Sequence, residues 1–212
     1  MTAKVLPAAA KIAVTVVRYE LNMWRSLFRW ITRRRGPGIE FSYAGAIAPI
    51  IWTFIVLSAL EIPAFHLLLP WEPVRAVIDI AGAYGLLWMI SLLASVRVNP
   101  HAVTGEGLRV RHSITTDFTV PWDAIESVRA RTRSVEKSRT VQVDGDTLII
   151  AIAHQTSVEV TLREPRSVRG HTVSSIHLYA DDAAGLVQRV RARLDMASGP
   201  GISPSPRLFD LA

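Results

Sequence analysis

Two uninterrupted apolar runs stand out in the middle of the chain. Residues 41–60 and 80–96 hold 20 and 17 consecutive positions without a charged side chain. About 20 apolar residues are needed to cross the hydrocarbon core of a bilayer. Because only a short link separates the runs, the pattern predicts a transmembrane hairpin within residues 39–98. We expect its helices over about 41–62 and 74–97.

A different pattern precedes the hairpin. Within residues 1–38, polar or basic side chains recur every three or four positions, which places them on one face of a helix. The opposite face carries valine, leucine and aromatic residues, as in a helix that lies in a membrane interface. The alternative is an ordinary amphipathic helix that packs on the protein's own domain. The polar positions are Lys11, Thr15, Arg18, Asn22, Arg25, Arg29 and Arg33.

The charge distribution predicts which way the hairpin faces. Residues 1–42 hold eight Lys/Arg and two Asp/Glu, whereas the link between the apolar runs offers only Arg75. Since cytoplasmic flanks of membrane spans are rich in Lys and Arg, both termini should be cytoplasmic in a multi-pass protein of the plasma membrane. Arginine and tryptophan both favour the headgroup region. We therefore expect a membrane-interface set of Arg18, Trp24, Arg25, Arg29, Trp30, Arg33, Arg34, Arg35 and Trp71.

From Asn99 onward the hydrophobic pattern changes to the period of two that is typical of strands. Leu108 and Val110 alternate with Arg109 and Arg111, and further alternating or apolar runs follow as far as residue 180. The segment ends in an amphipathic helix to about residue 196, with Asp181 as the expected N-cap. The pattern predicts six or seven antiparallel strands and one closing helix over 99–197. A flexible Pro/Ser/Gly tail over 198–212 follows.

Three stretches of this segment resemble a bacterial pleckstrin-homology-like (PH-like) domain. They are Val103-Thr-Gly-Glu-Gly-Leu-Arg-Val-Arg, Val120-Pro-Trp-Asp-Ala-Ile-Glu-Ser-Val and Ile176-His-Leu-Tyr-Ala-Asp-Asp with the basic helix after it. The resemblance implies a membrane α+β protein with a small antiparallel split barrel capped by a C-terminal helix. A hairpin followed by such a domain is similar to small actinobacterial two-span membrane proteins of unknown function. The resemblance brings neither catalytic residues nor a ligand.

Motifs of catalytic chemistry do not occur in the sequence. There is no cysteine, no Gly-x-Ser-x-Gly, no phosphate-binding glycine loop and no His-Glu-x-x-His. His171, His177 and Asp181 are close enough in sequence for a metal site, but one loop and one strand-surface histidine explain them equally well. We therefore expect a protein without catalytic residues, metal or cofactor.

A basic cluster is the main candidate for binding. Arg129, Arg131 and Arg133 alternate along a predicted strand, and Lys137 and Arg139 follow. Arginine forks suit phosphate groups or the carboxylates of a partner peptide. The alternative is a solvated strand face that is partly neutralised by Glu126 and Glu136.

The sequence favours a non-enzymatic membrane scaffold. Its partners would be the lipid bilayer and either another protein or a second copy of itself. Nucleic acid is not expected, because the basic excess precedes the hairpin instead of forming a stripe on the folded domain. The first hypothesis is protein–protein interaction or complex assembly at the inner face of the membrane. A module that responds to anionic lipid, and a subunit of a transporter or membrane enzyme complex, are the alternatives.

Overall fold

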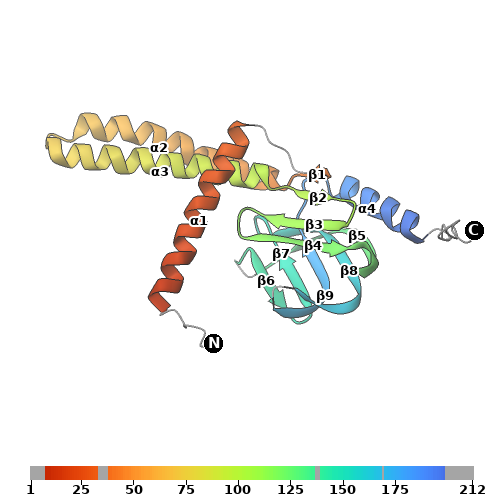
Figure 1. The fold of residues 1–212 in the computed structure, drawn as a ribbon. Coiled ribbons are helices and arrows are strands. Elements are labelled where there is room, and N and C mark those ends of the chain that lie inside the picture. Colours follow the sequence, from red (N-terminus) through yellow and green to blue (C-terminus); the bar gives the residue numbers. More distant parts are fainter. Residues whose placement is uncertain (1–7, 33–37, 137–138, 169, 199–212) are drawn as a thin grey trace, which may run out of the picture.

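A computed structural model describes residues 8–32, 38–136, 139–168 and 170–198. A long helical hairpin projects from one end of a β-rich domain, and a separate N-terminal helix runs at a steep inclination to it (Figure 1). The elements, in chain order, are α1 (Ala8–Ile31), β1 (Ile39–Phe41), the 3-10 helix η1 (Ala44–Ala46), α2 (Ala48–Leu68), α3 (Glu72–Val98), β2 (His101–Val103), β3 (Gly107–His112), β4 (Thr116–Pro121), the 3-10 helix η2 (Trp122–Ala124), β5 (Ile125–Ser134), β6 (Val141–Asp144), β7 (Thr147–Ile150), β8 (Gln155–Val168), β9 (His171–Leu178) and α4 (Ala183–Ser198).

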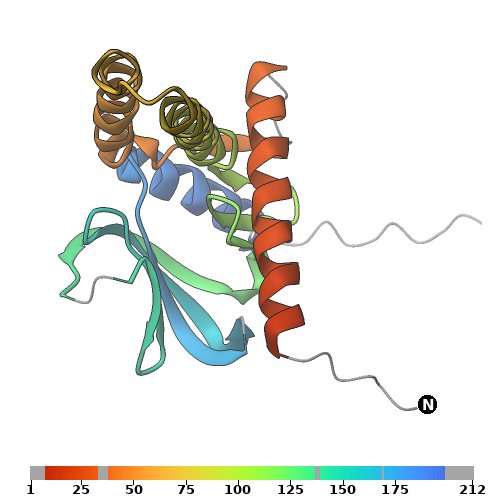
Figure 2. The ribbon, with the colours of Figure 1, turned by 90° about the vertical axis from the view of Figure 1, so that its left-hand side faces the viewer.

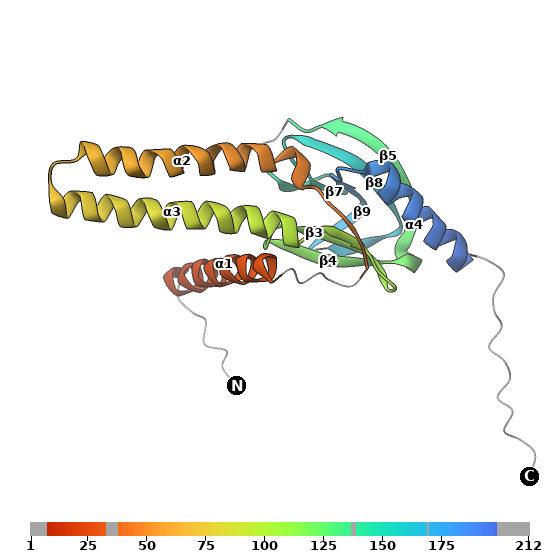
Figure 3. The same cartoon turned by 90° about the horizontal axis from the view of Figure 1, so that it is seen from above.

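The hairpin consists of α2 and α3, which run antiparallel and side by side (Figure 3). Both are long and apolar enough to cross a membrane, and only 11% of the most apolar window of each is buried inside the protein. Large apolar side chains such as Phe54, Leu60 and Leu67 are more than half exposed. A helix in the core of a water-soluble domain would bury such side chains.

The first hairpin helix begins later than the apolar run predicts. Its first residue is Ala48, and residues 39–41 form β1, which pairs with β2 through Ile39–Val103 and Phe41–His101. Apolarity alone does not separate a lipid-facing residue from one that is buried against protein, and Tyr43 belongs to the second kind. At the other end, Pro63 lies inside α2, which continues to Leu68.

The β-rich domain contains two sheets. One has the order β1-β2-β3-β4 and the other the order β5-β8-β9-β7-β6. The described strands do not form a closed barrel, and β7 pairs with β9 in parallel, so the expectation of purely antiparallel pairing was wrong for that pair. The sheets enclose one apolar core with the inner face of α4, which contributes Leu186, Val187 and Val190.

Two neighbouring aspartates precede α4, and the structure reverses their expected roles. Asp182 caps the helix, because its Oδ1 accepts the backbone N–H of Gly185 at 2.8 Å. Asp181 instead accepts the backbone N–H of Gly45, at 2.9 Å from Oδ2 and 3.1 Å from Oδ1. The predicted cap therefore ties the C-terminal part of the domain to the segment that enters the hairpin.

Candidate functional site

The hairpin enters the domain through a buried aromatic junction. Tyr43 is fully buried between the rings of His101 and His112, whose centroids lie 5.1 and 5.5 Å from its own. Its hydroxyl accepts the backbone N–H of Ser113, the first residue of the turn between β3 and β4. Ser113 has a φ of 49°, which is unusual for a residue other than glycine. Tyr43 therefore holds this turn in a strained conformation.

His101, in β2, forms hydrogen bonds through both of its ring nitrogens, one of them to the backbone of β3. Its Nε2 donates to the carbonyl oxygen of Tyr179 at 3.0 Å, and its Nδ1 accepts the backbone N–H of Arg111 at 3.1 Å. Both ring nitrogens are used only when the imidazole is neutral. Burial lowers the pKa of His101 to about 4, and burial also lowers the pKa of His112 to about 4. The junction is thus built from neutral histidines.

Apolar contacts and one short connection complete the junction. Ile51 of α2 and Leu93 of α3 are buried in a cluster that also contains Ile152, from the loop after β7. Only Asn99 and Pro100 separate α3 from β2, and the hydroxyls of Ser95 and Ser113 lie 2.8 Å apart. The hairpin and the domain therefore share a packed interior, and packed interiors resist deformation.

Helix α1 packs along α3 through one of its faces. Met23 and Ser26 are buried there, and Tyr19 stacks on Trp88 with ring centroids 6.4 Å apart. Glu20 accepts the indole N–H of Trp88 at 3.2 Å and the hydroxyl of Tyr84 at 3.3 Å. Figure 2 shows α1 beside α3 in a view along the hairpin.

The two remaining faces of α1 have opposite character. One is polar and turns toward the β-rich domain, where Arg29 donates to the carbonyl oxygen of Val98 and to Asn99 Oδ1, both at 3.1 Å. The other is apolar and points away from both the domain and α3, with side chains that are 51–68% exposed. Its residues are Val14, Val17, Leu21, Phe28 and Ile31.

A cleft of about 250 Å³ lies between the polar face of α1, the end of α3 and the turn between β3 and β4. Three arginines line it, two from α1 and one from β3, together with hydroxyl and amide side chains. The lining residues are Asn22, Arg25, Ser26, Arg29, Asn99, Arg111, Ser113, Ile114, Thr116 and Asp117. We call this pocket the junction cleft.

The positive charge of the junction cleft is incompletely matched within it. Among the described residues that line it, Asp117 is the only carboxylate, and Arg109 already holds both oxygens of that group, at 2.7 and 2.6 Å. Arg109 thereby lowers the pKa of Asp117. Arg111 is only 6% exposed, and its Nε and Nη1 donate no hydrogen bond within the described residues. Its Nε lies 3.6 Å from Asp117, beyond hydrogen-bonding distance.

The arginine cluster predicted on the domain lies elsewhere, on β5 at the edge of the five-stranded sheet. Arg129, Arg131 and Arg133 are exposed, and a register shift between Ala130 and Arg133 interrupts their regular alternation. Arg131 donates to Glu159 Oε2 at 3.3 Å, so Glu159 neutralises part of the cluster. Arg139 is also exposed, whereas Lys137 lies outside the described residues.

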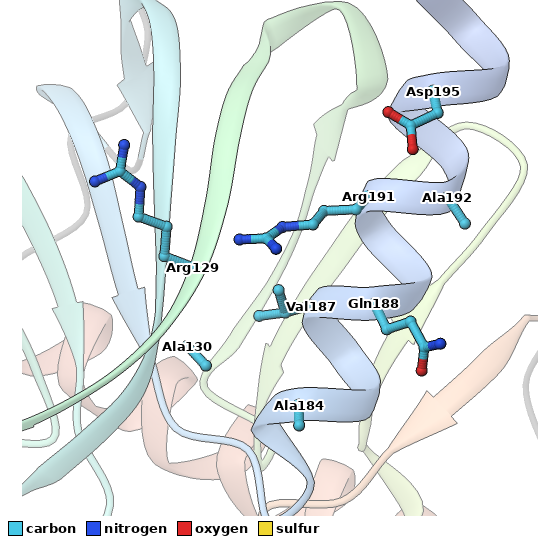
Figure 4. Close-up of a pocket in the computed structure, with 8 residues that line it drawn as sticks. All are labelled: Arg129, Ala130, Ala184, Val187, Gln188, Arg191, Ala192 and Asp195. Carbon is cyan, nitrogen blue, oxygen red and sulfur yellow. The ribbon is translucent and has the colours of Figure 1, made fainter.

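A groove of about 720 Å³ separates β5 from α4 (Figure 4). Arg191 reaches across it and donates to the carbonyl oxygen of Val128 through Nε at 3.2 Å and Nη2 at 3.0 Å. Arg129 extends from β5 away from Arg191. Between them the groove is floored by small apolar side chains, among them Ala130 and Ala184. We call this pocket the β5–α4 groove.

The expected membrane-interface residues are distributed over both ends of the hairpin. Arg18 and Arg25 are exposed, Trp24 is half-buried, and Trp71 at the far turn is 65% exposed. Trp30 lies under the guanidinium of Arg97, 5.8 Å from its ring centroid. Arg29 belongs to the junction cleft. Arg33, Arg34 and Arg35 lie outside the described residues.

The histidines considered for a metal site have other neighbours. His177 Nε2 lies 4.0 Å from Glu159, and burial lowers its pKa. Asp181 is bound to Gly45. No group of three or more His, Asp or Glu side chains that could hold a metal ion occurs in the described part of the chain.

Comparisons with known proteins assign no family, because no protein-family model, curated protein or solved structure matches this chain. The resemblance to PH-like domains therefore stays a prediction.

Proposed function

We propose that this chain is a non-enzymatic membrane-anchored scaffold. Its hairpin spans the membrane, both termini are cytoplasmic, and the β-rich domain is held against the inner leaflet in one fixed orientation. The buried junction around Tyr43 is the observation that carries this proposal. A domain attached by a flexible tether would need no such contacts, whereas the orientation of this domain follows from that of the hairpin.

Three further features support the membrane placement. The apolar side chains of α2 and α3 are exposed along most of their length. The apolar face of α1 turns away from the domain, as expected for a helix whose polar side faces the cytoplasm and whose apolar side faces lipid. Trp71 stands exposed at the far turn, at the depth where tryptophan favours the outer interface.

Because the chain contains no cysteine, its orientation can be tested without background labelling. Single cysteines would replace Glu72 at the far turn and Thr132 in the domain, both of which are exposed. A membrane-impermeant maleimide should label Glu72→Cys in intact cells and Thr132→Cys only after permeabilisation. Labelling of both positions in intact cells, or of neither after permeabilisation, would refute the proposed topology.

For the partner, we propose an acidic segment of another protein at the β5–α4 groove. Arg129 and Arg191 line the groove, and Asp195 is the one acidic residue among its described lining residues. The other β5 arginines lie beside it. This charge complements a partner rich in Asp and Glu, and opposite charge speeds and orients docking.

A photo-crosslinking amino acid at Ala192, which lines the groove, tests this assignment in intact membranes. The same amino acid at the exposed Asp146 is the matched control. Crosslinks should form from Ala192 only, and the variant R129Q/R133Q should abolish them. Identical crosslinks from both positions, or crosslinks unaffected by R129Q/R133Q, would rule the groove out as the partner site.

A further inference from the structure

The junction cleft contains a buried cation without a sufficient partner. Arg111 is only 6% exposed and is one of the residues that line the cleft. Its Nε and Nη1 have no hydrogen-bond partner among the described residues and are themselves shielded from solvent. Leaving a buried charged donor unpaired is among the costlier arrangements in a folded protein. An anion in the cleft would place a countercharge beside this guanidinium and offset part of that cost.

Two more arginines converge on the same space from α1. Arg29 donates to neutral acceptors only, the side-chain oxygen of Asn99 and the carbonyl oxygen of Val98. Arg25 is exposed at the rim. Asp117 is held in a bidentate pair by Arg109 and also lies 3.6 Å from Arg111 Nε, so the three guanidinium groups of the cleft share one carboxylate that is already paired.

Phosphate is the anion that this chemistry fits. Guanidinium groups form charge-assisted, fork-like hydrogen bonds with phosphate oxygens. Amide and hydroxyl side chains, here Asn22 and Ser26, line the same pocket. With about 30 Å³ per water molecule in the liquid, a cleft of about 250 Å³ has room for a phosphate group and part of the group it esterifies.

The position of the cleft indicates where the phosphate comes from. Asn99, the residue that directly follows α3, lines the cleft, so the cleft lies where the proposed membrane span enters the cytoplasm. This is the depth of the phosphate groups of the inner leaflet. On this ground, which rests on the proposed membrane placement, a phospholipid headgroup is within reach.

We infer that the junction cleft binds the phosphate group of an anionic phospholipid through Arg25, Arg29 and Arg111. The bound headgroup bridges α1 to the β3–β4 turn. Arg29 belongs to α1 and Arg111 to β3, which lie before and after the hairpin in the chain. The site is separate from the β5–α4 groove, with which it shares no lining residue.

Titration of the full-length protein in mild detergent tests the inference. The probes are a short-chain phosphatidylglycerol, the matching phosphatidylcholine and sodium phosphate, and the readout is the midpoint of thermal unfolding followed by tryptophan fluorescence. R25Q/R29Q removes two charges from the cleft, and R129Q/R133Q removes the same charge from β5 as the matched control. R25Q alone, at an exposed position, guards against misfolding of the double variant.

Phosphatidylglycerol should stabilise the wild type, and R25Q/R29Q should raise its apparent Kd by about tenfold or more, while R129Q/R133Q leaves it unchanged within about twofold. Sodium phosphate acting at the same concentrations with the same variant dependence would support the phosphate site and identify a soluble anion as its ligand. No stabilisation by any probe, or equal losses in both double variants, would overturn the inference. Because the titration in detergent does not depend on orientation, it can succeed even if the cysteine labelling refutes the topology.

Discussion

The chain carries two sets of arginines that behave differently. Arg129, Arg131 and Arg133 are neighbours in sequence, lie along β5 and remain exposed. Arg29 and Arg111 are 82 positions apart in the numbering, yet they meet in one cleft, and Arg111 is almost completely buried. The arginines that are close together in the sequence lie on an open surface, whereas those that are far apart in the sequence line a pocket.

The two sets of arginines differ in the structure that supports their side chains. The β5 arginines project from an edge strand into solvent, where long side chains gain little from a fixed geometry. The cleft arginines are positioned by a rigid junction, in which Tyr43 holds the β3–β4 turn and His101 holds the backbone of Arg111. A site that must orient an anion needs such support.

Removal of the central side chain of the junction should have the largest effect. Tyr43→Ala deletes a fully buried aromatic ring, which costs about 3–5 kcal/mol of unfolding free energy. Phe54→Ala, on the exposed surface of the same hairpin, should cost less than about 1 kcal/mol in detergent. Thermal unfolding of the purified protein measures both, and equal losses would mean that the junction is not a stabilising centre.

Acidification should have the next largest effect, because it destabilises the junction. His101 and His112 have folded-state pKa values of about 4, below the 6.5 of an unfolded chain. The unfolded chain therefore binds more protons than the folded chain between these two pKa values. The contribution of the neutral histidines to the free energy of unfolding is fully present above about pH 6.5 and is lost as the pH falls toward 4. For His101 this loss is on the order of 3 kcal/mol. Unfolding midpoints across this range should fall less steeply in His112→Gln than in the wild type. An unchanged dependence of the unfolding midpoint on pH would show that His112 does not contribute to the acid sensitivity.

Loss of the polar lock between α1 and α3 should have a smaller effect. Glu20→Ala removes the acceptor of Trp88 and Tyr84, so the unfolding midpoint should fall by less than in Tyr43→Ala. The emission of Trp88 should change, and α1 should become more sensitive to protease. Glu20→Gln, which keeps an acceptor oxygen, should lie between Glu20→Ala and the wild type. Identical protease sensitivity of all three proteins would contradict the contact.

The β5 arginines should be the least sensitive to change. Arg131→Met removes the exposed pair with Glu159, for which about 0.2–1 kcal/mol is expected. Its unfolding midpoint should stay close to that of the wild type. A loss of unfolding free energy as large as that of Tyr43→Ala would show that the β5 arginines stabilise the fold, which would contradict the difference between the two sets.

Local patterns in the sequence predicted most of the elements. The alternation of Leu108 and Val110 with Arg109 and Arg111 coincides with β3, and the two long helices follow from the apolar runs. The expected number of six or seven strands over 99–197 was wrong, because the described part of that segment contains eight, β2 to β9. The same patterns failed where burial comes from a distant segment. Alternation in β3 predicted Arg109 and Arg111 on one face, but it gave no sign that the end of the hairpin and α1 bury Arg111.

No pattern in the sequence predicted the junction. Tyr43 lay inside an apolar run that fitted a membrane helix, and Asp181 had the spacing of a helix cap. Only the pairing of β1 with β2 brings Tyr43 to His101, and only the packing of the domain brings Asp181 to Gly45. Arg25 and Arg29 were predicted at the interface as general headgroup contacts, and their convergence on Arg111 depends on tertiary structure.

Arg111 is proposed to be buried in order to hold an anion and not to stabilise the fold, and the variant R111M separates these two roles. Thermal unfolding of both proteins would be measured with and without short-chain phosphatidylglycerol. Without lipid, R111M should be at least as stable as the wild type, because replacing an insufficiently paired buried charge by an apolar side chain is often neutral or stabilising. With lipid, the order should reverse, since only the wild type gains a phosphate partner. A wild type that is more stable by the same margin in both conditions would contradict the claim and leave Arg111 as a structural residue.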